Sequence, residues 1–174
     1  MLEANIRYDG SSRFASGNKW GAFPSFSAGW RISEESFFEP IKDVVNNLKI
    51  RASWGQLGNQ NIGDYYPYFS MVNLDNKYVF DKTISSGAAI VNMANKNITW
   101  ETTTSTDIGL DVTLFNKLNI TADYFYKVTD DILMKLNIPL IIGMNAPQQN
   151  AGKMENRGWE IALSYADHVG DFNY

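Results

Sequence analysis

Apolar and polar side chains alternate along much of this chain, and the alternation is longest in two neighbouring stretches. In the first, Trp100 to Phe115, apolar residues recur at every second position: Ile108, Leu110, Val112 and Leu114. The second, Leu118 to Leu133, repeats the pattern, and little more than Asn116 and Lys117 lies between them. Because successive side chains of a strand point to opposite faces, the pattern predicts two long antiparallel strands with one apolar and one polar face.

Shorter alternating stretches predict further strands, so that the chain has about seven. These lie at 2–9, 23–33, 48–57 and 156–166, and a last strand begins at 172. Long connections follow Asp9, Leu57 and Leu133, whereas the shortest follow Phe115 and Ala166. The connector 33–47 is intermediate and predicts a short helical turn, and the long connection 58–97 predicts two short strands at 78–80 and 88–91.

Long strands with tight turns at one end and long loops at the other are typical of a membrane barrel, in which a tilted strand needs about 9–11 residues to cross. The sequence therefore predicts an all-β fold, an antiparallel transmembrane β-barrel segment with short periplasmic turns and long extracellular loops. Two alternatives remain open, because a soluble sandwich also alternates. They are a soluble carbohydrate-binding β-sandwich, and a small complete outer-membrane barrel acting as an adhesin or structural protein.

The positions of charged and aromatic residues favour the membrane barrel. Six charged residues within the strands have the parity of the polar face: Arg31, Arg51, Asp107, Asp111, Asp123 and Glu160. A cation on the lipid face would cost roughly 2–4 kcal/mol at mid-depth, whereas a water-filled lumen tolerates it. Aromatic residues near the strand ends are expected to form an interfacial girdle: Tyr8, Phe23, Trp54, Trp100 and Tyr126.

Composition excludes several classes of protein. The 174 residues carry a formal net charge of −4, which argues against nucleic acid as a partner, and contain no cysteine for disulfides, thiolate metal sites or thiol nucleophiles. There is no run of 18 apolar residues for a transmembrane helix. The first residues lack the basic start and apolar core of a signal peptide, so we expect the true N-terminus to lie upstream.

Several strings, taken together and in order, carry a specific family resemblance. They are RYDGSSRF (7–14), WGAFPSFSAGWRI (20–32), LKIRASWGQLGNQ (48–60), WE (100–101), DIGLD (107–111), DYFYK (123–127) and NRGWEI (156–161). The chain resembles the SusC/RagA-type TonB-dependent outer-membrane transporters of Bacteroidota over nearly its whole length.

This resemblance implies that residues 1–174 are part of the barrel domain of a larger, 22-stranded transporter. The plug domain, signal peptide and final barrel strands of such a protein are expected to be absent from this chain. The implied function is TonB-dependent import of large nutrients, glycans or oligopeptides, across the cell outer membrane. The implied partners are a SusD-like surface lipoprotein, the TonB complex acting through the missing N-terminal region, the cargo and outer-membrane lipid.

No set of residues predicts catalysis, so we expect no enzymatic activity, no cofactor and no metal. The sole histidine, His168, is expected in a solvated turn, and Asp107, Asp111 and Asp123 are expected to be solvated acids of the lumen.

Ligand contact is predicted instead for the long outer loop, which brings rings and amides together at Tyr65, Tyr66, Asn59 and Gln60. Such groups suit sugars or peptides through stacking and directional hydrogen bonds. The alternative is that they pack against other loops or against a lipoprotein lid.

Overall fold

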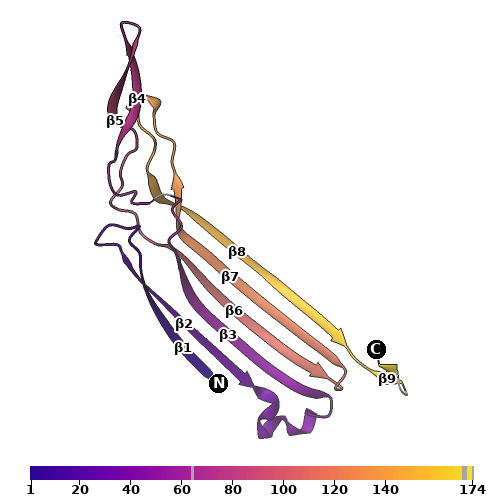
Figure 1. Cartoon of the computed structure of the whole chain (residues 1–174). Helices are drawn as coiled ribbons and strands as arrows, with labels where there is room; N and C mark the ends of the chain where they lie inside the picture. The colour runs from indigo at the N-terminus through magenta and orange to yellow at the C-terminus, as the bar shows by residue number, and fades with distance from the viewer. Residues whose placement is uncertain (64, 170–171, 174) are drawn as a thin grey trace.

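The computed structural model describes residues 1–63, 65–169 and 172–173, and its main feature is one long, curved antiparallel sheet (Figure 1). Six strands form this sheet in the order β1-β2-β3-β6-β7-β8. Their bounds are β1 (Leu2–Gly10), β2 (Trp20–Arg31), β3 (Val45–Asn59), β6 (Glu101–Leu114), β7 (Leu118–Lys135) and β8 (Gln148–Tyr165). The all-β antiparallel fold predicted from the alternation is confirmed, and the sheet is not closed into a barrel within the described residues.

The connections separate into two ends of the sheet, as predicted. One end, here called the loop end, carries the connections 11–19, 60–100 and 136–147 (Figure 1). The other, the turn end, carries the short helices η1 (Ile32–Glu34) and η2 (Ser36–Ile41) and the turn between β6 and β7. That turn centres on Phe115 and Asn116, both at φ 54°, a left-handed pair whose twist matches that of the flanking strands.

Two short strands, β4 (Val72–Phe80) and β5 (Thr83–Ile90), form a hairpin that projects beyond the loop end (Figure 1). The prediction of short strands here is confirmed, although both begin earlier than expected. The remaining loop contains one helical turn, η3 (Leu140–Ile142). None of the described helices is long and apolar enough to span a membrane.

The main strands differ from prediction chiefly at their loop-end boundaries. β3 extends to Asn59, and β8 begins at Gln148 rather than at 156, because pairing with neighbouring strands continues past the alternating stretch. The strand predicted from 172 does not join the sheet: Phe172–Asn173 (β10) pairs with His168–Val169 (β9). Residues 170, 171 and 174 of the predicted turn and strand, and the side chain of His168, lie outside the described part.

The register aligns the apolar positions of all six strands. Leu2 pairs with Ala28, Ala28 with Ala52 and Ala52 with Ile108, and the row continues through Tyr124 to Trp159. The result is one continuous apolar face. Its side chains are exposed, with Trp159 at 75% and Ile161 at 70%. Since no second sheet covers this face in the residues described, the sandwich alternative is not favoured.

Candidate functional site

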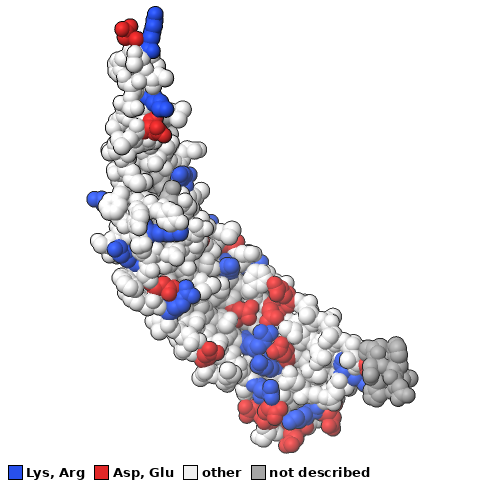
Figure 2. Space-filling view, in the orientation of Figure 1, with Lys and Arg blue, Asp and Glu red and all other residues white. Residues whose placement is uncertain are grey.

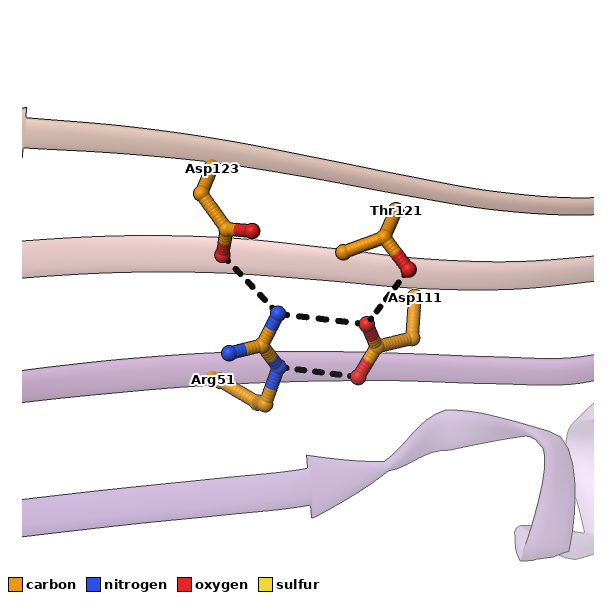
Figure 3. A network of polar contacts seen from close by, with 4 residues as sticks. All are labelled: Arg51, Asp111, Thr121 and Asp123. Carbon is orange, nitrogen blue, oxygen red and sulfur yellow. Dashed lines mark hydrogen bonds and ion pairs between the residues drawn. The ribbon is translucent and has the colours of Figure 1, made fainter. Parts of the chain in front are cut away.

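The centre of the polar face holds a four-residue network that crosses three strands (Figure 3). Arg51 on β3 donates from Nε to Asp111 on β6 at 2.8 Å and from Nη2 to Asp123 on β7 at 2.8 Å. Thr121 donates to the other oxygen of Asp111 at 3.3 Å. Arg51 Nη2 also donates to Asp111 Oδ1 at 3.2 Å, so the pair with Asp111 is bidentate, a strong form of charged hydrogen bonding, and the guanidinium binds Asp123 in addition.

Gly109 makes this network possible. It lies directly between Arg51 and Asp123 in the cross-strand row. A Cβ there would collide with Asp123 Oδ1 and lie 2.7 Å from Arg51 Nη2, so any side chain would displace the ion pair. Because Gly109 of β6 has no side chain, Arg51 on β3 and Asp123 on β7 can form an ion pair across β6.

The polar face is charged mainly toward the turn end, where blue and red side chains gather in Figure 2. A hollow of about 560 Å³ opens on this face, and its lining includes small residues such as Ser27, Gly29 and Ser53 together with the cations Arg31 and Lys49. The expectation of merely solvated acids needs refinement, because Asp111 and Asp123 are bound to Arg51.

At the loop end, a buried group ties the connections together. Phe14, Ile62 and Ile98 are buried, and Trp100 and Leu133 pack against them; we call these five residues the loop-end cluster. It joins the connections 11–19 and 60–100, which are far apart in the sequence, to strand β7, and it gives the loop end a fixed base. Sequence analysis did not identify the cluster, because its three buried members belong to irregular segments in which no period marks a buried face.

Side-chain amides complete this base by binding backbone groups. Asn150 accepts from Thr99 N at 2.9 Å and donates to the carbonyls of Thr99 and Asp131. Asn18 donates to the carbonyl of Ile98 at 3.1 Å. Amides suit this role because each supplies donors and an acceptor where strand pairing is interrupted.

The predicted aromatic girdle is only partly correct. Tyr8 is exposed on the apolar face and stacks on Trp20 at 5.2 Å. Phe23 is buried, so it cannot meet lipid headgroups, and its ring packs edge-on against Trp100 at 5.5 Å. The prediction was wrong for Phe23. The parity of Phe23, which it shares with Ser25 on the polar face, was a signal against it.

The four predicted ligand residues have different surroundings. The Asn59 side chain donates to Glu101 at 3.1 Å, whereas Gln60 accepts from Arg13 at 3.3 Å through its backbone carbonyl and not through its side-chain amide. Tyr65 is 72% exposed, and the Arg13 guanidinium lies 5.2 Å from its ring centre. Tyr66 adopts a left-handed conformation at φ 57° and lines a small cavity together with Tyr65.

Metal ligands do not gather in the described part of the chain, where no group of three or more His, Cys, Asp or Glu residues could hold an ion. The geometry instead defines a class of protein. A sheet with one exposed apolar face, one charged face, short turns at one end and long loops at the other is a section of a transmembrane β-barrel wall.

Comparison with known proteins identifies the family. The family model described as TonB dependent receptor-like, beta-barrel, matches residues 1–174, so the chain belongs to this family. Members of the family such as SusC are outer-membrane β-barrel proteins. The chain is 39% identical to TonB-dependent receptor P39 of Formosa agariphila over 94% of its own length and 15% of the relative. It is 38% identical to TonB-dependent receptor SusC of Bacteroides thetaiotaomicron, over 94% and 17%.

Solved structures agree with this assignment. The RagAB peptide importer in the "closed-closed" state matches with a TM-score of 0.83 at 27% identity, over 98% of this chain and 18% of that one. The same importer in the "open-open" state gives 0.82 at 27% identity, over 98% and 18%. The chain therefore spans less than a fifth of the proteins it matches.

Proposed function

We propose that this chain forms part of the wall and outer loops of a TonB-dependent importer of large nutrients, glycans or oligopeptides, in the outer membrane. The observation that carries the proposal is the register, which places an exposed apolar face on one side of six strands and a charged face on the other. The apolar face seats the wall in lipid, and the polar face lines the aqueous path. Residues 1–174 would all belong to the barrel domain, with the plug elsewhere in the full-length protein.

The proposal includes partners and excludes catalysis. A SusD-like surface lipoprotein would meet the loop end, and the TonB complex would act through another region of the full-length protein. Support comes from the relatives, one named SusC and another solved as RagAB. No chemical step is assigned to this chain, and the engagement of Asp111 and Asp123 by Arg51 supports a structural role for these acids.

Within the loop end, we assign cargo contact to Tyr65 and Tyr66, which expose aromatic surface, and to Asn59 and Gln60, of which Gln60 is linked to Tyr65 through Arg13. Uptake of defined glycans and peptides by cells producing the full-length protein tests both proposals. Uptake should require TonB, and replacing both tyrosines with Ala should reduce it severalfold. Tyr78→Ala, on the projecting hairpin and 65% exposed, is the control.

Each part of the proposal can fail separately. Uptake that continues in cells without TonB would contradict the importer. Unchanged uptake by the Tyr65→Ala, Tyr66→Ala variant, with TonB dependence intact, would retire the cargo contact alone.

A further inference from the structure

One face of the projecting hairpin carries two pairs of aliphatic residues. Pairing between the strands places Val79 opposite Ile84 near the tip and Val72 opposite Ile90 at the foot. Ile84 and Ile90 are an even number of positions apart on β5, so the two pairs share one face. All four side chains are exposed, from 48% at Ile90 to 68% at Ile84, so this face is largely uncovered within the described part of the chain.

The opposite face of the hairpin has a different character. Tyr78 lies opposite Ser85 and Phe80 opposite Thr83, so each aromatic ring has a hydroxyl group across from it. The two rings contact each other, with their centres 4.7 Å apart. Because this face combines rings with hydroxyl groups whereas the other carries aliphatic pairs, the aliphatic face is the one that a partner would bury.

A second exposed apolar group lies in the connection before β8. Leu140 and Ile141, on η3, are 97% and 94% exposed. Asn145 fixes this connection to the foot of the hairpin, since its backbone N donates to the Val91 carbonyl at 2.7 Å and its Nδ2 donates to Asn92 Oδ1 at 2.8 Å. The hairpin and η3 therefore rise from one junction (Figure 1). We call their exposed aliphatic residues the outer aliphatic surface: Val72, Val79, Ile84, Ile90, Leu140 and Ile141.

Lipid cannot reach the outer aliphatic surface. On β8 the apolar face ends at Trp159 toward the loop end, and the strand continues from there to Gln148. At roughly 3.3 Å per residue and a strand tilt of about 40°, this stretch rises roughly 25–30 Å above the apolar face. The hairpin projects farther still (Figure 1). Apolar side chains grouped in this way on the aqueous side mark a surface for protein contact.

The charge of the hairpin also favours a protein as the partner. Its two acids, Asp75 and Asp81, are balanced by Lys82 and by Lys77, which lies between the two aliphatic pairs. A segment without net charge has no attraction for an anionic polysaccharide, whereas an apolar groove on a protein matches it. Copies of the chain side by side in one membrane would meet through their lipid-facing sheets, below this surface. A protein resting on the loop end would meet the hairpin and η3 together.

We infer that the outer aliphatic surface is the binding site for the SusD-like lipoprotein, which receives the hairpin and η3 in an apolar groove. The inference rests on the proposed function and deepens it, because it names the part of the loop end that this partner binds. The hydrogen bonds of Asn145 hold the foot of the hairpin before the partner arrives, which lowers the cost of ordering it on binding.

Binding of the lipoprotein to the full-length protein in detergent tests the inference. The probe is the SusD-like lipoprotein encoded in the same gene cluster, produced without its lipid anchor, and microscale thermophoresis measures the dissociation constant. Val79→Thr combined with Ile84→Thr should raise this constant roughly tenfold or more, because each change puts a hydroxyl group into an apolar contact. Threonine is β-branched like valine and isoleucine, so the strands keep their propensity.

Two further double variants locate the effect. Leu140→Ser combined with Ile141→Ser should also weaken binding roughly tenfold or more, since it removes the apolar side chains of η3 from the contact. Tyr78→Thr combined with Phe80→Thr is the matched control, because these side chains are 65% and 63% exposed on the opposite face of the same hairpin. The control should change the constant by less than about twofold.

A crosslink identifies the occupant independently of these variants. Cells produce the full-length protein with photoreactive benzoylphenylalanine in place of Ile84, and mass spectrometry identifies the protein attached to it after irradiation. The expected adduct contains the lipoprotein, and the same group in place of Tyr78 should form much less of it. If the double variants do not fold, this adduct decides.

The outcomes separate this inference from the proposed function. An adduct with a second copy of the chain, with another protein or with none overturns the inference, as does a gene cluster that encodes no such lipoprotein. Unchanged binding in the folded aliphatic variants, or an equal loss in the control, overturns it too. TonB-dependent uptake without any binding of the lipoprotein overturns it and leaves the importer standing. Binding that the aliphatic variants weaken, together with uptake that continues without TonB, supports it and contradicts the importer.

Discussion

At the scale of single residues, glycines decide which side chains can meet. The ring of Phe23 lies over Gly58 and within 2.6 Å of where a Cβ of Gly21 would be. An aromatic ring covering strand glycines compensates for their missing side chains and excludes water from the backbone. The same principle operates on the polar face, where Gly109 leaves the space through which Arg51 reaches Asp123.

We expect Gly58→Ala to destabilise the full-length protein by about 1–3 kcal/mol, because the new methyl group would overlap the buried ring of Phe23. Gly29→Ala is the control, since its Cβ would lie 3.6 Å from Lys49 Cε in ordinary contact. Urea unfolding in lipid vesicles, followed by tryptophan fluorescence, measures both variants. Equal shifts of the two midpoints would count against the proposed packing.

At the scale of elements, each long strand has two faces with different surroundings. On β8 the outward positions near the turn end are all apolar or aromatic: Trp159, Ile161, Leu163 and Tyr165. The next outward position toward the loop end is Arg157, which marks the edge of the apolar belt on this strand. The intervening residues, such as Ala162 opposite Thr121, belong to the polar face.

Two adjacent substitutions on β8 should therefore have different effects. Ile161→Arg places a cation inside the apolar belt and should cost roughly 2–4 kcal/mol of stability in a bilayer. Ala162→Arg, one residue away, faces the aqueous side and should cost about 1 kcal/mol or less. Denaturant unfolding of the full-length protein in vesicles compares them, and similar losses would mean that the two faces share one environment.

At the scale of the whole molecule, the apolar belt shifts along the strands as it crosses the sheet. Trp159 marks its loop-end edge on β8, and the cross-strand row from Trp159 reaches β1 at Leu2. On β1, however, the belt extends six residues past Leu2, to Tyr8. Trp159 and Tyr8 therefore mark the same edge of the belt on two strands that are five steps apart in the sheet. With roughly 3.3 Å per residue and roughly 4.8 Å between strands, this shift corresponds to a strand tilt of about 40°. Barrel strands typically tilt by about 35–45°.

Spin labels in the full-length protein can measure this tilt directly, because residues 1–174 contain no cysteine and any cysteine elsewhere can first be replaced by Ser. Labels at Tyr8→Cys and Trp159→Cys should report the same depth near the outer headgroups. A label at Leu2→Cys, in the same cross-strand row as Trp159, should lie about 15 Å deeper. Equal depths at positions 2 and 159 would show that the strands do not tilt as the belt implies.

The sequence by itself determined the strands, their two faces and the alternation of long and short connections. Alternation with a period of two and turn residues are local properties of the sequence, and charge is excluded from the lipid face. The strands, their two faces and their connections can therefore be predicted without coordinates. Only the tertiary structure decided which residues meet across strands: the division of Arg51 between two acids, the burial of Phe23, the loop-end cluster and the cavity above it. These depend on register and on contacts between distant loops, which no local pattern encodes. Gly109 illustrates the difference. It matters because it has no side chain, and only the register shows that Arg51 and Asp123 lie on either side of it.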